Sequence, residues 1–241
     1  MSEFRLDQAI ANRGLASSRT QAESYIKLGL VRVNGNISSS TLMRVSDKDK
    51  IEIISKEQYV SRAGLKLASV ADQFEVDFKD KTVLDVGSST GGFTDYSVKH
   101  GAKKVIAVDV GSNQLHQTLR NSPIVELHEQ CDIRNLNQPK DLIDIVLIDV
   151  SFISLRQILP KIYSLSNNQT KIIAMFKPQF EAESESKIRG IIKNDRIRRD
   201  LIKGFEQWLK LNNFFIIKTL DSGISGTKGN LERFFLLKKS L

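Results

Sequence analysis

Residues 83–93 read VLDVGSSTGGF, an apolar run that leads through Asp85 into three glycines. The run predicts a buried strand, and the glycines predict a tight turn into a helix. Glycine permits such a turn and lets a ligand approach the backbone. The spacing is not the Gly-x-Gly-x-x-Gly of dinucleotide-binding proteins. A carboxylate before the first glycine suits a cationic amine better than a pyrophosphate, and a turn without any ligand also fits the pattern.

Strand-like and helix-like segments alternate on both sides of this turn from about residue 62 onward. Strands are expected at 82–86, 104–109, 124–128, 144–149 and 171–176, and amphipathic helices at 62–74 and 195–211. That alternation predicts a doubly wound α/β fold, with a parallel sheet and crossover helices. The apolar runs 214–217 and 234–237 predict two adjacent strands appended to it. Such a terminal pair is typical of class I methyltransferases, whose sheet is Rossmann-like.

Residues 1–54 predict a separate, small α+β module. Leu6, Ala9 and Ile10 have helical spacing, and Ser17 or Ser18 can start a second helix. Asn34-Gly35 after an alternating run is a strong hairpin signal. Residues 55–61 are polar and predict a linker, so the second domain is expected to occupy 62–241.

Composition narrows the classes of protein. The 241 residues carry a net charge of +8, which favours an anionic partner, nucleic acid first, although many globular proteins are mildly basic. A single cysteine, Cys131, excludes an internal disulfide and favours a reducing compartment, the cytoplasm. Apolar runs reach only five or six residues, against the roughly 20 of a membrane helix. Neither a secretory signal nor stable membrane insertion is expected, and three histidines with one cysteine leave no zinc cluster.

Acidic residues stand at the ends of the predicted strands. Asp109 follows the second strand, 24 residues after Asp85, where a carboxylate can accept both hydroxyls of a ribose. Asp132 follows the third strand and could receive an adenine amino group or cap a turn. Both readings stay open for Asp132.

Asp149 and Lys177 end the next two strands. Nucleobase-amine methyltransferases have two prolines at this place, which Asp149-Val-Ser-Phe152 lacks. C5-pyrimidine enzymes need a nucleophilic cysteine, and Cys131 lies on another predicted strand. Both reactions are therefore disfavoured.

Lys177 stands where α/β proteins bind ligands, and beside Asp149 it could deprotonate or orient a hydroxyl. The alternative is a solvated lysine at a strand end.

Five segments together resemble the TlyA family, whose members are often called hemolysin A. They are residues 59–67 (YVSRAGLKL), the loop after Asp85, 149–155 (DVSFISL), 177–181 (KPQFE) and 229–232 (GNLE). The first 54 residues, with RLD at 5–7, SR at 18–19 and VRVNG at 31–35, resemble the S4-type RNA-binding domain of that family. The resemblance covers essentially the whole chain.

The resemblance implies an FtsJ-like ribose 2′-O-methyltransferase that acts on ribosomal RNA or ribosomal subunits, with cytidine as the expected target. It implies a catalytic tetrad of Lys66, Asp149, Lys177 and Glu232. The implied cofactor is S-adenosylmethionine, with contacts expected from Asp85, Gly87, Ser88, Gly91, Gly92, Phe93, Asp109 and Asp132. RNA contacts are expected from Arg5, Arg19 and Arg32. The alternatives are methylation of another RNA, a non-catalytic ribosome-assembly factor, and a membrane-lytic hemolysin, which no apolar stretch supports.

Overall fold

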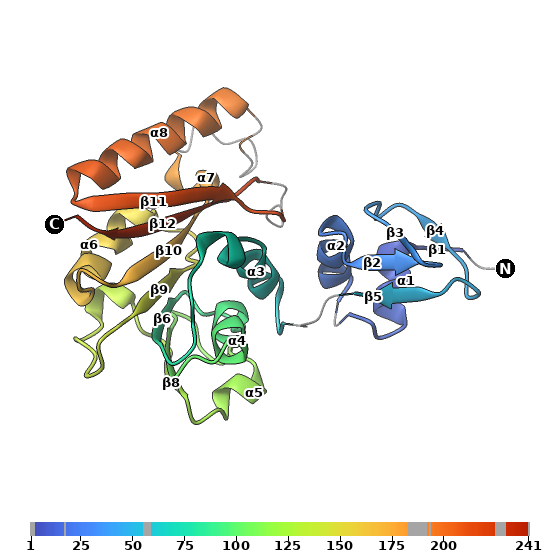
Figure 1. Cartoon of the computed structure of the whole chain (residues 1–241), viewed down its shortest axis with the longest axis horizontal. Helices are drawn as coiled ribbons and strands as arrows, with labels where there is room; N and C mark the ends of the chain where they lie inside the picture. Colours follow the sequence, from blue (N-terminus) through green and yellow to red (C-terminus); the bar gives the residue numbers. More distant parts are fainter. Residues whose placement is uncertain are drawn as a thin grey trace.

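The computed structural model describes residues 3–16, 18–54, 59–182, 192, 194–224 and 230–240. In these residues the chain forms a small N-terminal module and a larger C-terminal domain built on one sheet (Figure 1). The N-terminal module comprises β1 (Phe4–Arg5), α1 (Leu6–Asn12), α2 (Arg19–Lys27), β2 (Val31–Val33), β3 (Asn36–Ile37), β4 (Arg44–Val45) and β5 (Ile51–Ile53).

The local signals in the module act as the sequence predicts. Helix α2 begins after Ser18, whose hydroxyl oxygen accepts the backbone N–H of Gln21 at 3.2 Å. Ser17, the other predicted start, lies outside the described residues. Asn34 and Gly35 have φ values of 50° and 85°, as a tight hairpin turn between β2 and β3 requires. The pairing of β1 with β4 was not predicted, because strands of two residues show no periodicity.

The C-terminal domain is a seven-stranded sheet with helices on both faces. Its strands are β6 (Thr82–Val86), β7 (Lys104–Val108), β8 (Val125–His128), β9 (Ile145–Ile148), β10 (Lys171–Phe176), β11 (Phe214–Asp221) and β12 (Arg233–Lys239). Its helices are α3 (Arg62–Phe74), α4 (Gly92–Lys99), α5 (Gln117–Arg120), α6 (Leu155–Leu165), α7 (Pro178–Glu181) and α8 (Asp195–Leu211), with a 3₁₀ turn at Ile133–Asn135.

The strand order is β11-β12-β10-β9-β6-β7-β8. Strands β6 to β10 run parallel, and β12 pairs antiparallel with both β10 and β11. The predicted doubly wound sheet, its appended pair of strands and the small α+β module are therefore confirmed.

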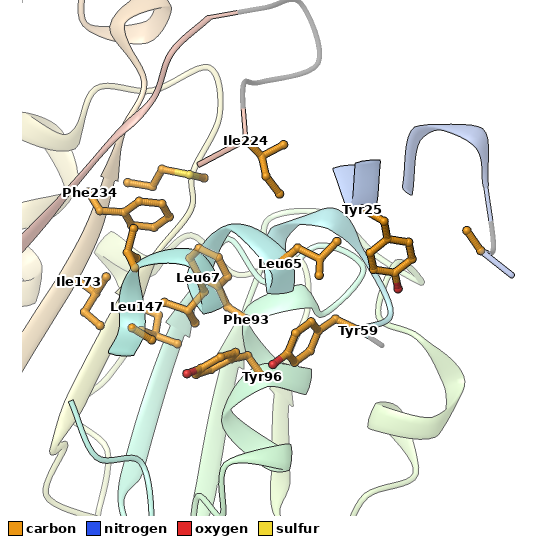
Figure 2. Close-up of a cluster of buried hydrophobic side chains, with 14 of the residues drawn as sticks. Tyr25, Tyr59, Leu65, Leu67, Phe93, Tyr96, Leu147, Ile173, Ile224 and Phe234 are labelled. Carbon is orange, nitrogen blue, oxygen red and sulfur yellow. The ribbon is translucent and has the colours of Figure 1, made fainter. Parts of the chain in front are cut away.

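Both faces of the sheet are buried at its central strands β6, β7, β9 and β10, which are apolar at consecutive positions for that reason, whereas the edge strands β8 and β11 are partly exposed. Val83 of β6 belongs to a cluster with residues of α3 and α4, part of which Figure 2 shows. The next residue, Leu84, belongs to a second cluster with residues of α6 and α8. Consecutive residues of one strand therefore pack on opposite faces of the sheet.

Two predicted strands end one residue earlier than expected. Strands β7 and β9 stop at Val108 and Ile148, so Asp109 and Asp149 lie just beyond the ladder. Carboxyl ends of neighbouring parallel strands meet at one edge, which brings these carboxylates together.

The predicted linker is described only from residue 59 onward. Tyr59 is buried, and the backbone N–H of Val60 donates to Asp95 Oδ2 of α4 at 2.8 Å. The end of the linker is therefore packed against the C-terminal domain.

Candidate active site

The turn after β6 packs against the loop after β9. Gly87 has a φ of +82°, and a β-carbon on it would lie 2.7 Å from the carbonyl oxygen of Asp149. A side chain at Gly87 would therefore push the two loops apart as well as strain the backbone. The glycine-rich stretch and Asp149 form one site because this position is glycine.

Two lysine–carboxylate pairs stand at the carboxyl edge of the sheet. Lys177 Nζ lies 2.5 Å from Asp149 Oδ1 and donates a hydrogen bond to Ser151 Oγ at 3.0 Å. Lys66 Nζ of α3 donates to Glu232 Oε2 at 2.5 Å, and both side chains are buried. The four residues of the implied tetrad thus form two ion pairs.

Both pairs line one cavity of about 920 Å³, the large cavity. Its wall also includes Ser18, Thr20 and Gln21 of the N-terminal module, together with residues 60–63. The large cavity is therefore built by both parts of the chain. Sequence reasoning missed the contribution of α2, because nothing in its sequence marks a side chain that reaches another domain.

An exposed aromatic side chain stands at the large cavity. Phe152 is 92 % exposed, and its φ of +65° is unusual for a non-glycine residue. Its ring centroid lies 5.1 Å from that of Phe180, which also lines the cavity. Two aromatic rings at the wall of a polar cavity offer stacking area to a planar group.

The loop that carries Phe152 is tied to the segment after Lys177. Glu181 is mostly buried and accepts hydrogen bonds from Ser154 Oγ and the Leu155 backbone N–H, both at 2.6 Å. Burial raises the pKa of Glu181 above its usual value. The sequence motif at 177–181 gives Glu181 no role of its own, and the structure shows that it connects the two loops.

A side cavity of about 370 Å³ lies beyond Asp149 and is lined by Gly87, Asp109 and Asp132 among others. Asp109 accepts the backbone N–H groups of Ser89 at 2.8 Å and Gly111 at 2.7 Å. Asp132 begins the 3₁₀ turn by accepting the Arg134 N–H, and its carboxylate pairs with the Arg134 guanidinium at 2.6 Å. Asp132 is thus a cap that also faces the side cavity.

A small cavity of about 150 Å³ lies along the glycine-rich turn, with Gly87, Ser88, Gly92 and Phe93 in its wall. Ser89, Asp149 and Ser151 line all three cavities. The large, side and small cavities therefore meet at these residues, and Lys177 stands in the wall of both the large and the small one.

Asp85 lies deeper than predicted. It is fully buried, and Thr94 Oγ1 donates to its Oδ2 at 2.6 Å. Burial raises the pKa of Asp85 to about 7, and the nearby charges of Asp149 and Asp109 add to the rise. Within the described part of the chain, the cavity walls do not include Asp85, yet its Oδ1 and Ser88 Oγ are buried without a hydrogen-bond partner. Gly91 precedes α4 as its N-cap.

The arginines expected to bind RNA differ in their surroundings. Arg5 and Arg19 both pair with the buried carboxylate of Asp7, at 3.1 Å and 2.7 Å. Arg32 of β2 is exposed and lies opposite Glu52 of β5. Arg5 and Arg19 therefore hold the module together, a role that the sequence pattern did not indicate.

Comparison with known proteins covers both parts of the chain. Residues 4–51 match the family model of the S4 domain, and residues 59–240 match the model described as FtsJ-like methyltransferase. Hemolysin A of Brachyspira hyodysenteriae is 38 % identical over 95 % of this chain and 97 % of its own length. The 16S/23S rRNA (cytidine-2′-O)-methyltransferase TlyA of Mycobacterium tuberculosis is 32 % identical over 97 % of this chain and 89 % of its own.

Solved structures give the same picture. A hemolysin-named protein from Streptococcus thermophilus is 34 % identical, with a TM-score of 0.75, over 100 % of this chain and 90 % of that one. A protein from Listeria monocytogenes named as an S-adenosylmethionine-dependent methyltransferase shares the fold, with a TM-score of 0.56 at 22 % identity over 75 % of this chain and all of that one. Among the described residues, no helix is both long and apolar enough to cross a membrane.

Proposed function

The chain belongs to the FtsJ-like methyltransferase family, together with its TlyA and hemolysin A relatives, and from that premise we propose that it methylates a ribose 2′-hydroxyl of ribosomal RNA. Relatives from Mycobacterium tuberculosis and Campylobacter jejuni are named for methylating the 2′-oxygen of cytidine in rRNA, so cytidine is the target that we propose. The observation that carries the proposal is the Lys177–Asp149 pair, which stands where the cavities meet.

The proposed cofactor is S-adenosylmethionine, and the residues present fit it. The side cavity offers Asp109 to the ribose hydroxyls and Asp132 to the adenine edge. The small cavity offers the glycine-rich turn to the methionine part, where Ser88 Oγ is a buried hydroxyl without a protein partner. When bound, this cofactor supplies a methyl group on a sulfonium, which is activated for displacement.

Lys177 is the residue proposed to act on the acceptor hydroxyl. An ammonium has three N–H donors; one is donated to Ser151 Oγ, and the ammonium lies at ion-pair distance from Asp149 Oδ1. A remaining N–H is available to the 2′-oxygen in the large cavity, where it would stabilise negative charge as the oxygen attacks the methyl group and the hydroxyl proton leaves to water. Lys66 and Glu232 form the second pair on the wall of the same cavity, from which they can hold the ribose in line with the methyl donor.

The acceptor nucleotide is proposed to enter the large cavity, with its base against Phe152 and Phe180. The N-terminal module would hold flanking RNA through phosphate contacts, which position a nucleic acid without reading its sequence. Because ribosomes are the source of the substrate, the proposal places the protein in the cytoplasm.

The test is transfer of tritiated methyl from S-adenosylmethionine to naked rRNA and to purified small and large ribosomal subunits. We expect label in at least one of these substrates, at a position where the modified ribose blocks alkaline cleavage on its 3′ side. Label on a base would contradict the proposal. Cofactor binding without transfer to any substrate would favour an assembly factor, and leakage of vesicles treated with the pure protein would favour a lytic one.

A further inference from the structure

The N-terminal module meets the C-terminal domain along α2. Tyr25 of α2 is fully buried in one continuous apolar cluster with Leu65 of α3 and Ile224, which follows β11 (Figure 2). Gln21 of α2 donates a hydrogen bond to the Tyr59 carbonyl, just before α3, at 2.9 Å. The module is therefore seated on two segments of the C-terminal domain, α3 and the residues after β11.

Gly223 lies close to both α2 and α3. A β-carbon on Gly223 would lie 3.3 Å from Leu28 Cδ2 and 3.4 Å from Ser69 Cβ. Leu28 ends α2, and Ser69 belongs to α3. Gly223 itself is exposed, but a β-carbon on it would press on half-buried Leu28 and Ser69, which would have to shift by a few tenths of an ångström.

The same two segments carry one of the two ion pairs of the site. Ser69 Oγ donates to the carbonyl of Lys66 at 2.6 Å, and the Ser222 backbone N–H donates to the carbonyl of Glu232 at 2.9 Å. Ser69, beside Gly223 in space, and Ser222, beside it in sequence, are therefore each hydrogen-bonded to the backbone of Lys66 or Glu232, whose side chains pair at 2.5 Å.

The other ion pair stands apart from this contact. Asp149 and Lys177 follow β9 and β10 and are held by the sheet. Any shift of α2 against α3 would move one pair of the tetrad relative to the other, because packed interiors transmit displacement rather than absorb it.

We propose that the seating of α2 on α3 and Gly223 aligns Lys66 and Glu232 with Lys177, so that the N-terminal module is part of the catalytic scaffold and not only an RNA anchor. This inference rests on the proposed function. Leu28 and Gly223 are positioning residues in it, acting through the Lys66–Glu232 pair. A misplacement of about 1 Å at a reacting centre costs on the order of 10²-fold in rate. Even a small displacement caused by a larger side chain at Gly223 is therefore expected to lower the methylation rate.

The experiment places a larger side chain at the contact and then shortens the side chain that it presses against. Gly223→Val is expected to lower kcat for rRNA methylation by about 10-fold or more. The KM for rRNA and the affinity for S-adenosylmethionine should stay within about 2-fold, because neither the RNA-facing side of the module nor the side cavity is changed. Adding Leu28→Ala removes the atom nearest the new side chain, and the double variant is expected to recover most of the lost kcat.

A matched glycine controls for the substitution itself. Gly204 lies in α8, where a β-carbon would meet only the Arg156 guanidinium, at 3.7 Å. Gly204→Val should leave kcat unchanged. Thermal melting of all variants checks that each is folded.

Hydrogen exchange on the same variants gives a readout that needs no activity. Gly223→Val should speed exchange in the first turns of α3 and in β12, and Leu28→Ala should reverse the effect. Unchanged kcat in Gly223→Val, a loss confined to KM for rRNA, or a loss that Leu28→Ala does not reverse would each overturn the inference. A wild-type chain without methyl transfer would instead contradict the proposed function, and the exchange pattern would then decide the positioning claim alone.

Discussion

Lys177 is the side chain on which the proposed chemistry depends most. It is buried at the end of β10, with its ammonium held by Asp149 and Ser151. Lys177→Ala should lower the methylation rate by ~10²–10⁴-fold, the usual cost of losing a positioned proton-handling group. Binding of S-adenosylmethionine should change by no more than a few fold, because Lys177 does not line the side cavity. A tritiated-methyl assay with parallel calorimetry measures both.

Lys177→Arg is the informative companion. A guanidinium carries its charge on a larger planar fork, which does not fit the place of a compact ammonium and cannot present an N–H to the 2′-oxygen in the same geometry. We expect the arginine variant to remain inactive. If Lys177→Ala turned over like the wild type, the 2′-O mechanism would be wrong and a base-directed reaction would have to be considered.

Asp109 tests the cofactor assignment independently of the chemistry. Its carboxylate already accepts two backbone N–H groups and still faces the side cavity. Asp109→Ala should weaken S-adenosylmethionine binding by ~1–3 kcal/mol, since it removes the acceptor proposed for the ribose hydroxyls. Calorimetry that shows unchanged affinity would contradict the ribose assignment.

Asp85 should make the stability of the cofactor-free protein depend on pH. Burial raises its pKa from 3.8 to about 7 in the folded chain. A raised pKa means that the folded state keeps its proton while the unfolded state has lost it, so stability falls as pH rises from about 4 to 7. The full effect is about 4 kcal/mol at most, at roughly 1.4 kcal/mol per pKa unit.

Asp85→Asn isolates that contribution. The amide is neutral at every pH and keeps an oxygen for the Thr94 hydroxyl. The free energy of unfolding of the variant minus that of the wild type should therefore increase between pH 5 and pH 8, as measured by urea denaturation. Parallel pH profiles for the two proteins would argue that Asp85 stays ionised in the fold.

At the scale of single elements, the sequence predicted those whose signals are local. The bounds of α3 and α8 agree with the expected 62–74 and 195–211, because both helices carry a long apolar stripe at helical spacing. The two-residue strands β1 and β4 exist only through their pairing with each other. Short strands of this kind depend on tertiary contact, which no window of the sequence contains.

The residues of the candidate site also differ in whether the sequence alone could predict their positions. Residues at strand ends, such as Asp109, Asp149 and Lys177, could be predicted from topology alone, since parallel strands deliver them to one edge. Lys66 and Glu232 were placed only by family resemblance, because they are 166 positions apart and meet through the fold. The contact of Asp7 with Arg5 and Arg19 was missed, because an acid in the first turn of a helix more often serves the helix dipole.

Asp7 is the residue by which α1 and α2 are joined. Burial raises its pKa, but the hydrogen bonds from Arg19 and Arg5 outweigh burial and leave the pKa below its ordinary value. Asp7→Ala should destabilise the module by ~1–3 kcal/mol, the cost of losing a buried, charge-assisted set of hydrogen bonds. The loss should not be larger, since both arginines are partly exposed and can turn to water.

Chemical denaturation followed by far-ultraviolet circular dichroism checks that expectation. Asp47→Ala is a suitable control, because Asp47 is an exposed acid of the same module. Equal stability of the two variants would mean that the Asp7 contacts contribute nothing measurable.

At the scale of the whole molecule, removal of residues 1–54 would not separate RNA capture from catalysis. The module covers Leu65 and Ile224, both nearly fully buried, so deletion would expose apolar surface beside Lys66. A charge substitution on the open side of the module leaves that contact intact. Arg32 is suitable because it is exposed on β2, whereas the ion pairs of Asp7 are made by Arg5 and Arg19.

Arg32→Ala should weaken binding of the full chain to rRNA uniformly across sequences while leaving kcat at saturating RNA unchanged. Binding of the wild type should fall steeply with salt, because each phosphate contact releases counterions, and loss of one contact should reduce the slope of log K against log salt by about 1. Lys140→Ala should change neither quantity, because Lys140 is an exposed lysine in the segment before β9.

Because Arg32 and Gly223 lie on different parts of the molecule, Arg32→Ala should act on affinity and Gly223→Val on turnover. Identical effects of the two substitutions would mean that the module has a single role.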